Sequence, residues 1–235
     1  MRGRLAVTRP EVPAGLVAIP VRTALVRGGD DLPGIVRDAV RGIAAPGDVI
    51  AISETAVASA QGQFVPAEFV RPSKLAYALS RRAGALATVN QPESLQLVID
   101  DAGAWKVFYA AAMHAVGRLS GKRGAFYEIL GESITAIDGY TGTLAPYERA
   151  IVLAPREPDA FAQSVCERTG IACAVVDAND LERAKVLGAS ACVARTCVAN
   201  ALLDNPHGNG DEQTPIVVLK WRGASDGNPL VERPG

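Results

Sequence analysis

The sequence predicts an α+β fold in which mixed β-sheets are flanked by helices. Short apolar runs typical of buried strands and longer segments with helical spacing both occur along the 235 residues. The two kinds of segment do not alternate strictly, which argues against a uniformly parallel sheet built from βαβ units. Apolar residues make up 49% of the chain and charged residues 21%, a composition typical of globular proteins with a sizeable core.

The first half of the chain begins with a strand and a capped helix. Residues 16–21 are an apolar run that predicts a strand, and Asp31 is placed to cap a helix over residues 32–43. A second apolar run, residues 49–52, predicts a buried strand that ends at residues 53–54. Three helical segments then follow, at residues 73–82, from residue 91 and over residues 102–119.

The last of these segments carries a stripe of large apolar side chains. Trp105, Phe108, Tyr109 and Met113 recur at helical spacing, and we expect them to lie in the core rather than to form a stacking surface for a ligand. His114 lies in the same Ala-rich segment and is expected to have a structural role.

The second half of the chain mixes strands and helices. The expected elements are strands at residues 126–130, 134–138 and 151–153, a helix from Asp159 to about Gly170, a strand at 171–176, a helix at 194–203 and a last strand at 216–221. An N-terminal extension over residues 1–15, one domain over residues 16–223 and a frayed tail over residues 224–235 complete the predicted organisation.

Composition and charge exclude several classes of protein. The formal net charge of −1 and the lack of a basic patch argue against nucleic-acid binding. No apolar stretch reaches membrane-spanning length and the N-terminus lacks the apolar region of a signal peptide, so we expect a cytoplasmic protein without a membrane partner. The four cysteines have no zinc-binding spacing and are expected to be small buried side chains in a reducing compartment.

Common nucleotide-binding and nucleophile motifs do not occur in the sequence. Residues 117–123 are one spacer residue short of a P-loop, and Arg123 stands where Ser or Thr would bind magnesium. There is no Rossmann glycine fingerprint after a strand and no nucleophile elbow. The two histidines, His114 and His207, give no clear Ser/His/Asp arrangement.

Acidic side chains at strand ends are the main candidates for a site. Asp138 and Asp177 each follow an apolar run, and Asp211 and Glu212 lie in a glycine-containing loop before the last strand. Carboxylates that are desolvated together repel one another, and Mg²⁺ or Mn²⁺ would offset this repulsion. Glycines let backbone N–H groups approach a phosphate, so the pattern predicts a metal–phosphate site. The alternative is that each acid only caps a helix or solvates a turn, and Asp180 in particular is placed to cap a helix.

Several stretches of the chain together match the motifs of a known enzyme family. In chain order they are IPVRT at residues 19–23 with GDDL at 29–32, PGDVIAISE at 46–54, AID at 136–138, VVDAN at 175–179 and GNGD at 208–211. Their types and order resemble those of the coenzyme F420-0:L-glutamate ligase family, also called γ-glutamyl ligase. The likeness covers most of residues 16–223, and the order of the stretches is more specific than any one of them.

This resemblance implies a γ-glutamyl ligase-like fold, a homodimer, and a GTP-dependent, metal-dependent amide ligase. Members of the family phosphorylate a substrate carboxylate to an acyl phosphate, which the amine of glutamate then attacks. Such a reaction needs neutralisation of phosphate charge and close positioning of the nucleophile. The expected substrates are therefore GTP, a small molecule with a carboxylate and glutamate, and the expected cofactor is Mg²⁺ or Mn²⁺.

The resemblance also assigns roles to individual residues. Asp138 and Asp177 would hold the metal ion. The nucleotide would be bound by Thr23, Ala24, Leu25, Val26, Glu54 and Thr141, and by a loop closing over phosphate that contains Gly208, Asn209, Gly210, Asp211 and Glu212.

Departures from the family pattern keep an alternative function open. Ser59 stands where a lysine is common in a nucleotide-contacting segment, Ala178 replaces a metal-binding threonine, and the motif's arginine falls near Leu181. Loss of cationic and metal-binding groups weakens a triphosphate site. The alternative is a non-catalytic homologue that binds a nucleotide or another phosphorylated ligand as a sensor or partner subunit.

Overall fold

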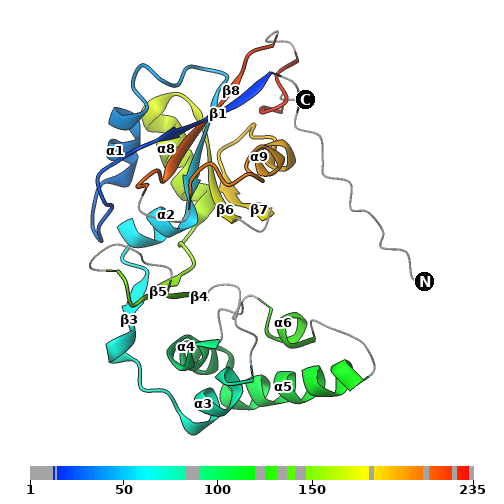
Figure 1. Ribbon diagram of the computed structural model, residues 1–235. Coiled ribbons are helices and arrows are strands. Elements are labelled where there is room, and N and C mark those ends of the chain that lie inside the picture. The colour runs from blue at the N-terminus through cyan, green and yellow to red at the C-terminus, as the bar shows by residue number, and fades with distance from the viewer. Residues whose placement is uncertain are drawn as a thin grey trace, which may run out of the picture. The chain divides into compact units, whose positions relative to one another are not determined.

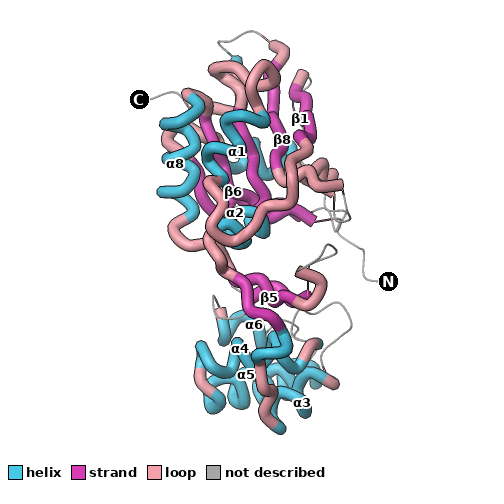
Figure 2. Tube along the Cα trace, turned by 90° about the vertical axis from the view of Figure 1, so that its left-hand side faces the viewer, coloured by secondary structure: helices cyan, strands magenta, loops and turns pink. Residues whose placement is uncertain are grey.

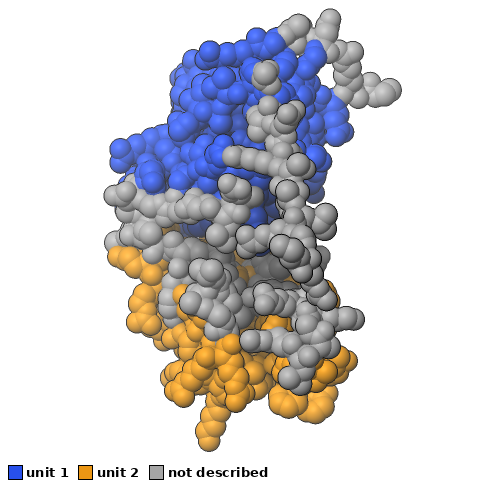
Figure 3. All heavy atoms as spheres, turned by 45° about the vertical axis from the view of Figure 1, so that its right-hand side comes forward, with its two compact units in different colours: residues 1–60, 156–235 blue, residues 61–155 orange. Residues whose placement is uncertain are grey.

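The chain divides into two compact units. Unit 1 comprises Met1–Ala60 and Arg156–Gly235, and unit 2 comprises Gln61–Pro155, so unit 2 is an insertion in the chain of unit 1 (Figure 3). The structure is a computed structural model. It describes residues 13, 15–82, 90–119, 125–131, 137–140, 147–179, 183–208, 212–223 and 227–232.

Unit 1 contains a five-stranded mixed sheet. Its strands are β1 (Leu16–Val21), β2 (Val49–Ser53), β6 (Ala172–Asn179), β7 (Arg183–Ala189) and β8 (Ile216–Trp221), in the spatial order β1-β8-β2-β6-β7. β2 and β6 are parallel, whereas the pairs β1–β8, β2–β8 and β6–β7 are antiparallel. The predicted fold class, a mixed sheet flanked by helices, is thereby confirmed.

Helices cover both faces of this sheet. α1 (Leu32–Ala39), α2 (Glu54–Ala60) and α8 (Pro158–Thr169) pack on one face, and α9 (Arg195–Ala201) packs on the other (Figures 1 and 2). β2 lies in the middle, and its first four residues are completely buried, with alternate side chains in the two apolar layers. A strand covered on both faces is apolar throughout, which explains why residues 49–52 predict it correctly.

Unit 2 combines a small antiparallel sheet with helices. The sheet has the order β3-β5-β4, formed by β3 (Phe64–Pro66), β4 (Ile137–Tyr140) and β5 (Ala150–Leu153). The helices are a 3₁₀ turn (Ala67–Phe69), α3 (Lys74–Ser80), α4 (Pro92–Ala102), α5 (Ala104–Leu119) and α6 (Ala125–Leu130). Unit 2 has its own apolar core, which includes Leu95, Leu130 and Ile151. In the described part of the chain, no helix is both long and apolar enough to cross a membrane.

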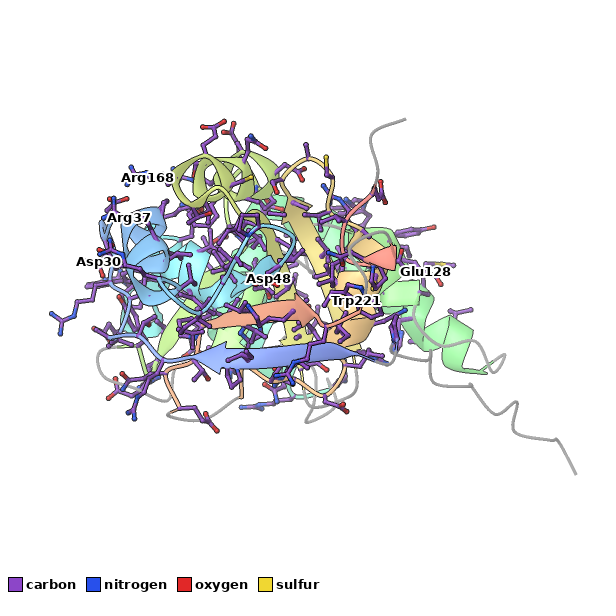
Figure 4. All side chains as sticks on the ribbon, turned by 90° about the horizontal axis from the view of Figure 1, so that it is seen from above. Asp30, Arg37, Asp48, Glu128, Arg168 and Trp221 are labelled. Atoms are coloured by element: carbon purple, nitrogen blue, oxygen red, sulfur yellow. The ribbon has the colours of Figure 1, made fainter. Side chains whose placement is uncertain are left out.

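Two predicted helix starts are confirmed by their caps. Asp31 accepts a hydrogen bond from a backbone N–H in the first turn of α1, and Ser73 does the same for α3. Asp31 also accepts a hydrogen bond of 2.7 Å from Arg168 Nη1, which ties α1 to α8. Arg37 of α1 and Arg168 of α8 are labelled in Figure 4, where the two helices lie next to each other.

The strand expected at residues 126–130 is wrong, because this segment is helix α6. Aromatic and β-branched residues favour a strand only where they fit a pleated surface. In unit 2 they pack on a helix instead: α6 contacts α5, Leu130 is buried in the core, and the ring of Phe126 meets that of His114 edge-on. Tertiary packing therefore overrides the local preference.

The core position expected for the apolar stripe of α5 is also wrong. The side chain of Trp105 is 80% exposed, and those of Phe108, Tyr109 and Met113 are exposed as well. Val107 is on the opposite side of the helix and is completely buried. Because α5 is apolar on both sides, its periodicity cannot tell which side faces the core.

The residues expected to be frayed after Gly223 pack on unit 1 over residues 227–232. Leu230 is completely buried in the apolar layer under α9, and Val231 forms an antiparallel bridge with Val193. The side-chain amide of Asn228 donates a hydrogen bond of 2.7 Å to the carbonyl of Gly47. A short polar sequence with one leucine gives little sign of such an anchor.

Candidate functional site

One end of the five-stranded sheet gathers most of the described candidate residues. At this end, which we call the carboxyl edge, β1, β2 and β6 finish and β7 and β8 begin. In open sheets with parallel strands, ligands bind beyond the carboxyl ends of those strands. The segments that meet at this edge are therefore the first place to look for a site.

The segment Thr23–Val26 leaves the carboxyl edge directly after β1. The backbone N–H of Thr23 donates to the carbonyl of Gln213 at 2.9 Å, and the Thr23 hydroxyl donates to the carbonyl of Ala24 at 2.8 Å. Val26 is buried in the apolar layer beneath α1 and anchors the far end of the segment. This candidate nucleotide segment is thus tied to the loop that leads into β8.

That loop is organised by a buried histidine, His207. Its Nδ1 lies 3.2 Å from the carbonyl of Thr214, and the Thr214 hydroxyl donates back to the carbonyl of His207 at 2.5 Å. Because Nδ1 faces a carbonyl oxygen, we assign it the proton, which leaves Nε2 as an acceptor. Within the described part of the chain this buried Nε2 has no hydrogen-bond partner. Burial lowers the pKa of His207 to about 4, so the ring is neutral at pH 7.

Gly208 and Glu212 bring the two sides of the same loop together. Gly208 has a φ of +74°, and a Cβ built on it would lie 2.7 Å from the carboxyl carbon of Glu212. The positive φ favours glycine at this position, and the end of the flexible Glu212 side chain lies directly over its Cα. The sequence pointed to these two residues, but it gave no sign that His207 holds the loop, because a lone histidine has no motif around it.

Asp177 lies inside β6 rather than after it. The strand runs on to Asn179, and the chain then returns as β7, which the sequence did not predict. Residues 183–189 are strand β7, so no helix begins in this segment for Asp180 to cap, as the alternative explanation of this acid would require; Asp180 itself lies outside the described residues. Asp177 therefore projects from a two-stranded hairpin, because β7 pairs with β6 as far as Asn179.

The carboxylate of Asp177 is half-buried and weakly compensated. Strand alternation places Asp177 on the same face as Cys173 and Val175, the face that α1, α2 and α8 cover. Burial raises the pKa of Asp177, and the positive charge of Lys185 opposes this rise. Among the described residues, the Asp177 carboxylate has no hydrogen bond and no ion pair within bonding distance, so its oxygens remain available for a ligand.

Glu54 leaves the sheet beside Asp177. In the parallel pairing of β2 and β6, Ser53 lies in register with Val176, and Glu54 and Asp177 are the next residues of their chains. Helix α2, which begins at Glu54, contacts β6. Two carboxylates thus emerge at neighbouring positions of the carboxyl edge.

These carboxylate oxygens fit a hard divalent cation whose remaining coordination positions are filled by other oxygens. Mg²⁺ is commonly held by one or two carboxylates together with waters and substrate phosphates. Over the described ranges, no group of three or more His, Cys, Asp or Glu side chains is placed to hold a metal ion. Asp177 and Glu54 would therefore hold such a cation only together with ligand oxygens or with residues beyond these ranges.

The remaining candidate residues are placed elsewhere or lie outside the described residues. Asp138 lies in β4 of unit 2, in register with Val152, whereas Asp177 belongs to unit 1. The convergence of the two aspartates on one ion stays a prediction. Thr141, Asn209, Gly210 and Asp211 lie outside the described residues.

Comparison with known protein families gives a match over most of the chain. The family model described as F420-0:Gamma-glutamyl ligase matches residues 20–176, which is more than half of the chain and runs from β1 to β6. No curated protein matches the sequence.

Proposed function

Since the chain belongs to the F420-0:Gamma-glutamyl ligase family and is therefore expected to be a ligase, we propose that it is a nucleotide- and divalent-metal-dependent amide ligase. In the proposed reaction the carboxylate of a small molecule attacks the γ-phosphorus of GTP, which gives an acyl phosphate and GDP. The amine of glutamate then attacks the acyl carbon. An amide forms, inorganic phosphate leaves, and the amine loses a proton.

The observation that carries this proposal is the meeting of distant segments at the carboxyl edge. Thr23–Val26, Glu54, Asp177 and the described loop residues Gly208 and Glu212 belong to four separate stretches of sequence, and each stretch precedes or follows a strand at this edge. The family resemblance selected Thr23–Val26 and Glu54, and the pattern of acids at strand ends had already selected Asp177 and Glu212. Their common location supports a shared ligand.

The residues of the carboxyl edge have distinct roles in this proposal. Asp177, with Asp138 and Glu54 as partners, holds the divalent cation, which neutralises phosphate charge when bound. The backbone of Thr23–Val26 and the glycine loop hold the nucleotide, since backbone N–H groups bind phosphate without adding charge. Close positioning of the acyl phosphate and the amine then supplies much of the rate.

Calorimetry on four proteins tests the proposal. We expect the wild type to bind Mn²⁺ with GTP, and Asp177→Asn and Asp138→Asn to lose Mn²⁺ binding. Asp38→Asn is the matched control, because Asp38 is an exposed partner of Arg37 and Arg41 on α1. The proposed metal site is wrong if both site variants bind Mn²⁺ as tightly as the wild type. Glutamate-dependent release of GDP and phosphate then tests the reaction.

A non-catalytic binding protein is the second candidate function. Ala178 packs in the apolar layer under α9, on the face opposite Asp177, and Ser59 is buried within α2. Neither position offers a metal ligand or a cation to a nucleotide at the carboxyl edge. Tight GTP binding without any GDP release in the presence of glutamate favours this candidate.

We also propose that the protein is a homodimer in which α5 contributes to the contact. Trp105 stacks on Phe108 with ring centroids 5.7 Å apart, and these side chains with Tyr109, Met113 and Val116 form one exposed apolar stripe. The stripe offers on the order of 500 Å² per chain, so two copies approach the area of a small specific interface. Sedimentation velocity of the wild type and of Trp105→Ser checks this, since the variant should shift toward monomer.

A further inference from the structure

The β6–β7 hairpin places a cation beside Asp177 at the carboxyl edge. Asp177 lies in register with Lys185, and Asn179 lies in register with Arg183. Side chains of residues directly opposite each other on antiparallel strands point to the same face, with Cβ atoms about 4.5–5.5 Å apart. Lys185 therefore belongs to the same face of the sheet as Asp177.

The opposite face of the hairpin confirms this assignment. Ala178, Ala184 and Val186 alternate with the polar residues, and all three pack against the apolar layer under α9. Lys185 and Arg183 are exposed, so their charges stay in water at the open end of the sheet. One face of the hairpin is thus apolar and packs on the core, and the other face carries the charged side chains near the carboxyl edge.

Lys185 differs from the lysine at the opposite end of the same sheet. Lys220 Nζ donates two hydrogen bonds there, to Asp48 Oδ2 at 2.6 Å and to the carbonyl of Ile43 at 2.7 Å. Within the described residues Lys185 has no such partner, and its interaction with Asp177 is a charge attraction without an ion pair at bonding distance. Its ammonium is free to meet an anion.

A purely structural explanation of Lys185 also exists. β7 is the edge strand of the sheet, and charged side chains on edge strands prevent pairing with other chains. Protection of the edge requires a charge somewhere on β7 but not opposite a half-buried carboxylate at the carboxyl edge. The register of Lys185 with Asp177 favours a binding role.

We propose that Lys185 binds a phosphate group of the nucleotide beside the cation held at Asp177. This inference rests on the proposed function, because it requires a phosphorylated ligand at the carboxyl edge. Lysine is a flexible point charge that commonly pairs with phosphate oxygens, and a cation on one side and an ammonium on the other neutralise a polyphosphate together.

Matched variants separate phosphate binding from edge protection. Lys185→Gln should weaken binding of GTP with Mn²⁺ by about 10- to 100-fold, the range expected for loss of one charge-assisted contact. Lys185→Arg should keep most of the affinity. Binding of Mn²⁺ alone should be unchanged or tighter in Lys185→Gln, because a repelling positive charge is removed. The control is Arg222→Gln, since Arg222 is an exposed cation at the other end of the sheet.

Each outcome decides between the proposals. Wild-type affinity for GTP in Lys185→Gln overturns this inference and leaves the proposed function standing. An equal loss in Arg222→Gln also overturns it, because the effect is then one of net charge. A wild-type protein that binds no GTP with Mn²⁺ overturns the proposed function and this inference together.

Discussion

Two aspartates of the same sheet experience opposite surroundings. Asp48, just before β2, is buried but accepts hydrogen bonds from Lys220 Nζ at 2.6 Å and from the backbone N–H of Ala45 at 2.8 Å. Asp177, beyond the other end of β2, is half-buried, and burial raises the pKa of its carboxyl group. The carboxylate of Asp48 is therefore paired and hydrogen-bonded, whereas the charge of Asp177 destabilises the fold at neutral pH.

Asp177→Asn should raise the melting temperature at pH 7. A folded-state pKa above the unfolded value means that stability is fully present below the unfolded pKa of about 3.8 and is lost as pH rises through the folded pKa. The asparagine removes this loss, so the gain should be clear at pH 7 and small near pH 4. Scanning calorimetry at both pH values measures it. A lower melting temperature of the variant at pH 7 contradicts the argument.

Asp48→Asn is the counterpart of this variant and should behave in the opposite way. It leaves the ammonium of Lys220 without its carboxylate, and we expect a loss of about 1–3 kcal/mol in the free energy of unfolding. If Asp177→Asn is more stable than the wild type and has also lost Mn²⁺ affinity, then Asp177 favours function over stability, a known pattern at binding sites.

His207 should make stability depend on pH in the acidic range. Its folded pKa of about 4 lies below the usual 6.5, so the unfolded chain takes up the proton first. Stability is complete above pH 6.5 and is lost as pH falls through about 4, by up to about 3 kcal/mol. Urea unfolding at pH 7 and pH 4 measures the loss of stability in the wild type and in His207→Gln. Comparison of the two proteins cancels the titration of other groups. Equal pH dependence in the two proteins contradicts the prediction.

At the scale of elements, the close approach of α8 to β7 depends on one glycine. A Cβ on Gly188 would lie 2.2 Å from the carbonyl carbon of Pro158 and 2.4 Å from the backbone nitrogen of Asp159. Backbone atoms of a helix start cannot move aside cheaply. Gly188→Ala should therefore cost at least about 2 kcal/mol by displacing the first turn of α8. Chemical unfolding of this variant measures the cost.

Gly227→Ala is the matched control for this substitution. A Cβ at Gly227 would meet no atom within 4 Å, so the free energy of unfolding should change by less than about 0.5 kcal/mol. Similar stability of both variants would mean that α8 and β7 separate more easily than their contact indicates.

The sequence predicts elements well where local signals and packing agree. The apolar run of residues 49–52 is buried on both faces, and Asp31 and Ser73 cap the helices that they precede. β7 is not predictable in the same way, because a register shift at residues 186–188 interrupts its alternation and Gly188 is an unusual strand residue. Segment 126–130 is mispredicted because contact with α5 decides its structure.

The candidate site is predictable as a set of residues but not as a geometry. Thr23–Val26 and Glu54 come from the family resemblance, and Asp177 comes both from it and from its position after an apolar run. Their common location at the carboxyl edge depends on the order of strands in space. Lys185 and His207 have no motif in the sequence. They become candidates only through the register of β6 with β7 and through the hydrogen bonds of His207 with Thr214.

At the scale of the whole molecule, the C-terminal residues complete unit 1. Deletion of residues 224–235 removes the completely buried Leu230 and the bridge between Val231 and Val193. We expect a loss of at least about 2–5 kcal/mol, the usual effect of removing one buried leucine side chain. Urea unfolding measures it, and Leu230→Ala in the full chain should reproduce most of the loss. A deleted chain as stable as the full one contradicts the packing of this segment.

The position of unit 2 in the chain has a consequence for biosynthesis. β2 pairs with β8 and β6, and both of these partners are translated only after residues 61–155. The apolar run of residues 49–52 therefore leaves the ribosome before either of its partner strands, and both of its hydrogen-bonding edges stay unpaired while the second core can form. During that interval the nascent chain is most prone to aggregate, and chaperones that bind exposed apolar strands should recognise residues 49–53.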